Sequence, residues 1–160
     1  MLTIFSTEIE RKIVMQKPYY EKQNFTLYQA NCLNVLAELP ENSVDMVFAD
    51  PPYLLSNGGF TVHAGRQVSV NKGAWDKSNG LKKDFEFHLE WIQAVRRVLK
   101  PSGTLWISGT YHSIYQCGFA LQVAGFHVLN DIAWFKPNAF EARAFLMRLP
   151  AKCRFSLNHN

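Results

Sequence analysis

Strand-like and helix-like segments alternate along this 160-residue chain, and the alternation restricts the fold more than any other feature. Apolar runs typical of buried strands lie at 25–30, 43–50, 104–108 and 126–135. Helical spacing of apolar residues marks the intervening segments 32–39, 84–100 and 112–125. This series predicts an α/β fold with a mostly parallel sheet and helices on both faces.

The helix expected after residue 83 gives that sheet an apolar surface to pack against. Its apolar residues recur at helical spacing on one face: Phe85, Leu89, Ile92, Val95 and Leu99. Asp84 suits the first turn, and Pro101 with Gly103 is expected to end the helix. With 48% hydrophobic residues, the chain can bury the core of one domain.

Charge and cysteine content bear on the partners, the cellular compartment and the metal content of the protein. A net charge of +4 permits a polyanionic partner without requiring one. The first 16 residues do not resemble a secretory signal, and no apolar run approaches the roughly 18 residues of a membrane span. Cys32, Cys117 and Cys153 share no metal-like spacing and are expected to be reduced thiols. We therefore expect a cytoplasmic protein without a metal.

The segment "VFADPPYLLSNGG" (47–59) carries the strongest chemical signal. Asp50 ends a predicted buried strand, and in α/β sheets ligands bind beyond the carboxyl ends of strands. Pro51 and Pro52 fix the backbone that follows, and Tyr53 adds a flat amphipathic ring. Residues 51–83 hold five of the nine glycines, as a long functional or mobile loop would.

Hydrogen-bond acceptors beside an aromatic surface suit the exocyclic amine of a nucleobase. If the Asp50 carboxylate and the Pro51 carbonyl accept the two amine hydrogens, the nitrogen lone pair becomes available for attack. A flipped base loses a few kcal/mol of stacking and pairing energy, and Tyr53 could return roughly 1–3 kcal/mol by stacking. The alternative is an ordinary turn in which Asp-Pro begins a loop and tyrosine packs over it.

The phrase "FADPPY", preceded by "NCLNVLAELPENSVD", resembles the S-adenosylmethionine-dependent amino-methyltransferases of DNA. The later phrases "VSVNKGAWDKS", "VLKPSGTLWISGTYHSIYQCG" and "GFHVLNDIAWFKPN" are similar to the β-class adenine methyltransferases of restriction–modification systems. The resemblance covers residues 25–138. It implies a Rossmann-like methyltransferase fold and transfer of a methyl group to adenine N6, because relatives acting on cytosine N4 more often have serine in place of Asp50.

The resemblance also implies roles for individual residues. The catalytic residues would be Asp50, Pro51, Pro52 and Tyr53, and the residues near S-adenosyl-L-methionine would be Asn31, Cys32 and Asp50. Asn31 departs from the aspartate usual at that position. The residues expected to face DNA are Lys72, Trp75, Asp76, Lys77 and Lys136, although Lys72 and Lys77 could simply be solvated. His112 is expected to be a structural histidine.

Two features depart from the family pattern. The glycine-rich F-x-G-x-G cofactor loop is absent, and the family's His-Glu-Thr strand is replaced by "AFEARAFLMRLPAKCRFSLNHN". We predict an N-terminal arm or leading strand (1–24), a catalytic part (25–138), and a divergent basic tail (139–160) that contains no strand. The fold would then be incomplete at its C-terminus, through a frame shift or truncation near Asn138 or because the enzyme is split. A complementing C-terminal fragment or a second copy of the chain would be its protein partner.

The sequence thus favours a site-specific DNA adenine methyltransferase with DNA as its partner. An RNA base methyltransferase and a non-catalytic nucleic-acid binder remain as alternatives. The first would prefer unpaired RNA, and the second would tolerate the loss of Asp50.

Overall fold

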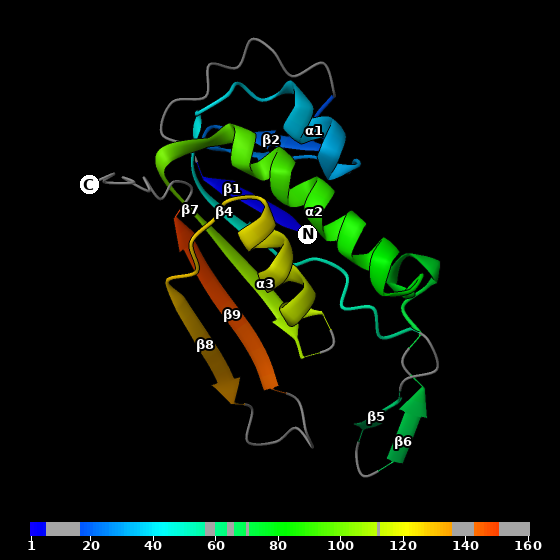
Figure 1. Cartoon of the computed structure of the whole chain (residues 1–160). Helices are drawn as coiled ribbons and strands as arrows, with labels where there is room; N and C mark the ends of the chain where they lie inside the picture. The colour runs from blue at the N-terminus through cyan, green and yellow to red at the C-terminus, as the bar shows by residue number, and fades with distance from the viewer. Residues whose placement is uncertain are drawn as a thin grey trace, which may run out of the picture.

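The computed structural model describes most of the chain, namely residues 1–5, 17–56, 60–63, 66–69, 71–111, 113–135 and 143–150. The strands in these ranges are β1 (Leu2–Phe5), β2 (Tyr20–Lys22), β3 (Phe25–Leu27), β4 (Val44–Ala49), β5 (Phe60–His63), β6 (Arg66–Ser69), β7 (Leu99–Thr110), β8 (Asn130–Phe135) and β9 (Arg143–Pro150). The helices in the same ranges are α1 (Cys32–Glu38), the 3₁₀ turn η1 (Ala74–Asp76), α2 (Leu81–Val98) and α3 (Ile114–Val123). Figure 1 shows their arrangement.

The central sheet has five strands in the order β1-β4-β7-β9-β8, and it is mixed. Among these described strands only β4 and β7 are parallel neighbours; β1 is antiparallel to β4, and β9 is antiparallel to both β7 and β8. It follows that β4, β7 and β8 run in one direction while β1 and β9 run in the other. The α/β class is confirmed, but the expectation of a mostly parallel sheet is wrong.

Strand β9 explains most of this difference. The sequence predicted no strand in the tail, yet Arg143–Pro150 forms β9 and pairs along its length with both β7 and β8. It separates two strands that would otherwise have been parallel neighbours. The segment lacks β-branched residues and contains two arginines, so its local composition gave no strand signal. Its pairing on both sides, rather than its propensity, makes it a strand.

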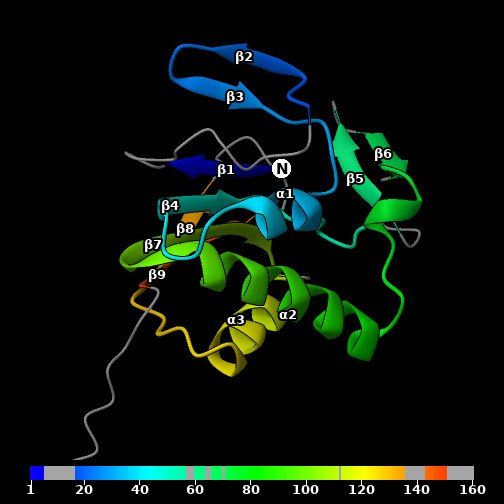
Figure 2. The same cartoon turned by 90° about the horizontal axis from the view of Figure 1, so that it is seen from above.

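The apolar core lies between one face of the sheet and the helices. Cross-strand neighbours Val47–Leu105 and Ala49–Ile107 of β4 and β7 are at most 2% exposed and belong to one cluster with α1, α2 and α3. The three described helices lie on this face (Figures 1 and 2). The expectation of helices on both faces is therefore wrong for the described residues, because none of their helices covers the second face.

Local signals fix the ends of the helices much as predicted. Asn31 caps α1, and its side-chain oxygen accepts a hydrogen bond from the Leu33 N–H at 3.0 Å. Helix α3 ends at Val123, and Gly125, two residues later, has a φ of +81° that allows the Phe126 N–H to bond back to the Leu121 carbonyl. Helix α2 starts at Leu81, three residues before Asp84, and ends at Val98.

Two segments of the chain form separate hairpins that the sequence did not predict. Strand β3, expected in the central sheet, instead pairs with β2 in a separate exposed hairpin. The predicted long loop contains a second hairpin, β5–β6, and the turn η1. In Figure 1 this second hairpin projects away from the sheet beyond the start of α2. Within the described ranges, every helix is too short or too polar to span a bilayer.

Candidate active site

Asp50 stands at the carboxyl end of β4, where the neighbouring parallel strand β7 brings up Ser108. The Ser108 hydroxyl donates to the Asp50 carboxylate oxygen Oδ1 at 2.6 Å. The β4–β7 register explains this contact, since Ala49 pairs with Ile107 and the next residue of each strand is Asp50 and Ser108. Asp50 is also tied to β1, because its N–H donates to the Met1 carbonyl at 2.8 Å.

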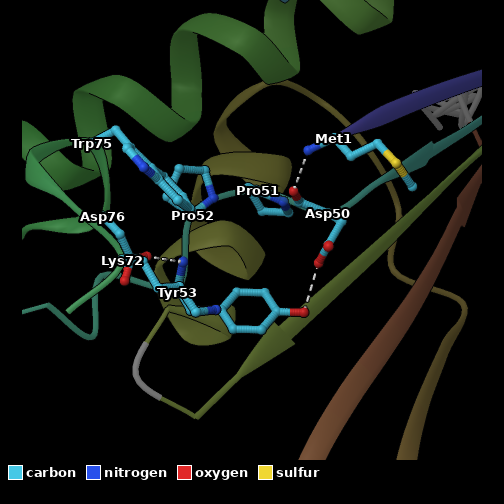
Figure 3. A pocket seen from close by; sticks show the side chains of 8 residues that line it. All are labelled: Met1, Asp50, Pro51, Pro52, Tyr53, Lys72, Trp75 and Asp76. Atoms are coloured by element: carbon cyan, nitrogen blue, oxygen red, sulfur yellow. Dashed lines mark hydrogen bonds between the residues drawn. The ribbon is translucent and has the colours of Figure 1, made fainter. Parts of the chain in front are cut away.

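Tyr53 points back toward this carboxylate. Its hydroxyl donates to Asp50 Oδ1 at 2.6 Å (Figure 3). It also lies 3.3 Å from the Ser108 hydroxyl. Burial raises the pKa of the Tyr53 phenol, and the hydrogen bond to Asp50 raises it further. Tyr53 is therefore a protonated donor, and two hydroxyl groups orient one carboxylate oxygen.

A small pocket opens beside these groups. Its volume is about 230 Å³, and it is lined by Met1, Asp50, Pro51, Pro52, Tyr53, Lys72, Trp75 and Asp76. The four predicted catalytic residues all line it, together with three of the five residues predicted to face DNA (Figure 3). The pocket is smaller than the roughly 300–1,000 Å³ typical of drug-sized ligands, so one flat base suits it better than a whole nucleotide.

The rim of the pocket carries a cation and a second aromatic ring. The Lys72 amine lies 5.2 Å from the centre of the Tyr53 ring, which is cation–π distance. Trp75 is 63% exposed in η1. Lys72 thus covers one face of the ring that was predicted to stack on a base, and a base stacking on that face would have to displace it. A phosphate contact by Lys72 stays a prediction.

Asp76 is buried, and its carboxylate is engaged by hydrogen bonds from within the chain. Its side chain is fully buried, and its carboxylate accepts hydrogen bonds from the backbone N–H groups of Tyr53 (2.9 Å), Leu54 (3.0 Å) and Leu55 (3.3 Å). The Ser56 hydroxyl adds a fourth hydrogen bond at 2.8 Å. These donors are Tyr53, the last of the predicted catalytic residues, and the three residues after it. Contact of Asp76 with DNA stays a prediction.

The other predicted site residues lie elsewhere. Asn31 and Cys32 are exposed at the start of α1 and are not among the residues that line the pocket. The side-chain oxygen of Asn31 is engaged as the cap of α1. Lys77 is exposed and also outside the lining. Lys136 and His112 lie outside the described residues.

Ser108 and Ser56 complete the site and were not predicted from the sequence. A signal for Ser108 was present, because it ends a predicted strand and the carboxyl ends of parallel strands meet at one edge. Ser56 gave no such signal. Its contacts with Asp76 and with the Lys72 N–H, at 2.9 Å, cross a loop whose path the sequence did not reveal.

The sequence comparisons agree with this geometry. The family model described as DNA methylase matches residues 44–155. The chain is 48% identical over 126 residues to the type II methyltransferase M2.LlaDCHI of Lactococcus lactis subsp. cremoris, covering 79% of this chain and 47% of that protein. It is 47% identical over 126 residues to M2.DpnII of Streptococcus pneumoniae, with the same two coverages of 79% and 47%.

Solved structures show the same fold. The cytosine-N4-specific PvuII DNA methyltransferase matches with a TM-score of 0.65 at 17% identity, over 87% of this chain and 53% of its own. TTHA0409 of Thermus thermophilus, complexed with S-adenosyl-L-methionine, matches with a TM-score of 0.50 at 19% identity, over 76% and 51%. At these identities the likeness concerns the fold alone.

These matches cover most of this chain but only about half of each curated relative. The chain spans about half the length of the curated relatives it matches. The family model covers well over half of the chain and includes the pocket residues from Asp50 to Asp76. The chain therefore belongs to the DNA methylase family.

Proposed function

We propose that this chain carries the target-base pocket of a site-specific DNA methyltransferase that methylates adenine N6. The observation that carries the proposal is the Asp50 carboxylate, fixed at a strand end by Ser108 and Tyr53 and opening into a pocket of base size. Adenine is preferred over cytosine because the first motif position is aspartate, as the family resemblance implies.

The geometry suggests which oxygens would accept the two hydrogens of the adenine amine. Both hydroxyl donors bind Oδ1 of Asp50, so among the described residues Oδ2 faces no donor and is the oxygen left for an amine hydrogen. The Pro51 carbonyl is the second proposed acceptor. With both hydrogens accepted, the nitrogen lone pair would be free to form the new C–N bond to the donor's methyl carbon as that carbon's bond to the sulfonium sulfur breaks, and the sulfur would keep the electron pair as a neutral thioether. The methylated amine would then release one proton to water.

S-adenosyl-L-methionine is the proposed cofactor and would supply the methyl group. The described residues fit it only in part. Asp50 lies at the pocket, but Asn31 and Cys32 do not line it, and the chain has no F-x-G-x-G loop. Therefore we assign no cofactor contact beyond Asp50, and we propose that the loop holding the methionine part comes from another polypeptide segment.

The sheet supports such a partner. On the face without described helices, the cross-strand neighbours Phe48 and Trp106 are only half-buried, and Met46 lies beside them on β4. Ser108 lies on this same face, two residues after Trp106 along β7. A segment equivalent to the unmatched half of the relatives would cover apolar side chains here and reach the site from the same side.

The test is methyl transfer from labelled S-adenosyl-L-methionine in the presence of the C-terminal half of the Lactococcus lactis relative. The matched pair is Asp50→Ala and Asp45→Ala, because Asp45 is an acid on the same strand whose carboxylate binds Lys100 at 2.7 Å. We expect Asp50→Ala to abolish labelling of DNA and Asp45→Ala to retain it. Labelling that survives Asp50→Ala overturns the proposal.

Substrate competition separates the remaining alternatives. For a DNA methyltransferase, methyl labelling of an immobilised DNA substrate should fall when competing duplex DNA is added, and unpaired RNA should compete weakly. Stronger competition by unpaired RNA would favour an RNA base methyltransferase. Nucleic-acid binding that Asp50→Ala leaves intact, without any labelling by the wild-type chain, would favour a non-catalytic binder.

A further inference from the structure

Asp76 sits at the centre of a cluster of hydrogen bonds directly behind the catalytic motif. Three consecutive N–H groups, of Tyr53, Leu54 and Leu55, converge on its two carboxylate oxygens. Converging N–H groups of this kind form an anion-binding nest. Here the anion is a side chain from a segment more than twenty residues along the chain, so the contact fixes one part of the loop to the other.

Backbone strain occurs at the same place. Leu54 has a φ of +59°, in the left-handed region that a leucine rarely adopts. Such a conformation persists only where the surroundings hold it, and these outliers cluster at functional sites. The Leu54 N–H donates to Asp76 and the flanking N–H groups do the same, so the nest provides that restraint.

Ser56 extends the cluster to the rim of the pocket. Its hydroxyl donates to Asp76 and accepts from the Lys72 N–H, while its own N–H donates to the Asp76 carbonyl at 3.1 Å. Lys72 in turn places its amine over the Tyr53 ring. One buried acid therefore links the residues that follow Asp50 to the residues that border the pocket.

The path of the chain at η1 explains how Asp76 reaches this position. Gly73 precedes the turn with a φ of +115°, a conformation that residues with a side chain rarely adopt. A Cβ atom at Gly73 would also approach the Trp75 indole to 3.1 Å. The turn leaves Trp75 exposed and directs Asp76 inward.

We propose that Asp76 is a positioning residue that holds the Tyr53–Ser56 backbone, and hence the Tyr53 ring, in the geometry that receives a base. The inference rests on the proposed function for the base-binding step, but the clamp itself can be measured without it. The printed hydrogen bonds of the Asp76 carboxylate go to Tyr53, Leu54, Leu55 and Ser56, so we assign it an action through the Tyr53 backbone.

The first measurement is amide hydrogen exchange in the complete chain. Asp76→Asn removes the negative charge and one of the two acceptor oxygens, so it should speed exchange within Tyr53–Leu55, by about tenfold where one hydrogen bond is lost. Asp84→Asn is the matched control. Asp84 is 4% exposed and binds the Asn79 N–H at 2.8 Å, so it is a similar buried acid that holds a different loop. Its variant should leave residues 53–55 protected.

The second measurement is capture of a flipped base. A DNA duplex carrying 2-aminopurine opposite a mismatch changes its fluorescence when that adenine analogue leaves the base stack and enters the pocket. We expect Asp76→Asn to weaken capture by about tenfold or more and Asp84→Asn to leave it unchanged. Wild-type exchange rates at 53–55 in Asp76→Asn, or faster exchange with undiminished capture, would overturn the inference.

Failure of the proposed function and failure of the clamp can be told apart, even where the wild-type chain captures no base or Asp76→Asn does not fold. If the wild-type chain captures no base, the proposed function fails, while the exchange rates still decide whether the clamp exists. If Asp76→Asn does not fold, Ser56→Ala replaces it. That variant should expose the Lys72 N–H to exchange and leave the Tyr53 N–H protected, and an unchanged Lys72 N–H would contradict the clamp.

Discussion

Asp50 receives two hydrogen bonds on a single carboxylate oxygen, and this fixes which oxygen remains for a substrate. The donors are the hydroxyl groups of Ser108 and Tyr53, each at 2.6 Å from Oδ1. They come from different parts of the chain, one from the neighbouring strand and one from the motif itself. The carboxylate is therefore held in one orientation by the chain itself.

Ser108→Ala tests that orientation. A hydrogen bond to a charged group contributes about 1.5–3 kcal/mol, so its loss should lower the methyl-transfer rate of the complemented enzyme by about 10- to 100-fold. Ser108→Thr keeps a hydroxyl group and should retain most activity. Equal rates for the alanine and threonine variants would show that Ser108 does not orient Asp50.

Tyr53 has two separable parts, a ring and a hydroxyl. Tyr53→Phe keeps the stacking surface, so 2-aminopurine capture should change little. Tyr53→Ala should weaken capture by roughly 1–3 kcal/mol, the stacking contribution of one aromatic ring. Equal capture by the two variants would mean that the base does not stack on Tyr53.

Among the elements, α2 and α3 meet at a buried histidine. The Nδ1 atom of His88 accepts from the Trp91 indole N–H at 3.2 Å and lies 3.4 Å from the Cys117 sulfur. Burial lowers the pKa of His88 to about 4, although the nearby Asp84 carboxylate acts in the opposite direction. Burial also raises the pKa of Cys117 to about 12, so the thiol is neutral.

This histidine predicts acid sensitivity of the α2–α3 contact. In the unfolded chain, His88 has its ordinary pKa of 6.5. In the folded chain, His88 stays unprotonated until the pH falls to about 4. The unfolded state therefore binds more protons in that window, and stability should fall by roughly 3 kcal/mol as pH drops through it. Above pH 6.5 the contribution is fully present.

The measurement is the free energy of unfolding by urea between about pH 7 and pH 4, the window that the histidine pKa values define. His88→Gln keeps an acceptor for Trp91 but cannot be protonated, so its stability should fall less than that of the wild type. His127→Gln, at an exposed site, serves as the control and should follow the wild type. Parallel curves for wild type and His88→Gln would contradict the assignment.

Elements with strong local signals were predictable, and elements made by pairing were not. Helix α1 could be placed from its leucine spacing and α3 from Gly125, because these signals act within a few residues. The Asn31 cap is also a local signal, but Asn31 was assigned to the cofactor instead. Strand β9 and the separation of β3 from the central sheet depend on distant partners. In the site, Asp50 and Tyr53 were predictable from their motif. The burial of Asp76 was not predictable, because it depends on the path of the loop.

For the whole molecule, the sheet face without described helices is the surface where we expect a partner to dock. Phe48 and Trp106 are half-buried there, and the relatives are about twice as long as the part they share with this chain. If the unmatched half of a relative docks on this face, Phe48→Ser should weaken binding of the Lactococcus lactis C-terminal half. Losing one buried aromatic side chain costs about 1.5–3 kcal/mol, or about 10- to 100-fold in affinity.

Titration calorimetry of the two polypeptides measures this affinity. Phe25→Ser is the control, because Phe25 is 56% exposed on the separate β2–β3 hairpin and should not take part. Unchanged affinity for Phe48→Ser, or an equal loss for both variants, would place the docking surface elsewhere.

The most direct test of the proposed adenine N6 methylation identifies the methylated nucleoside. The chain is incubated with methyl-labelled S-adenosyl-L-methionine and duplex DNA, with and without the C-terminal half of the relative, and the DNA is digested to nucleosides. We predict label in N6-methyladenine, dependent on the added half. Label in N4-methylcytosine, or none with both halves present, would contradict the assignment of this pocket to adenine.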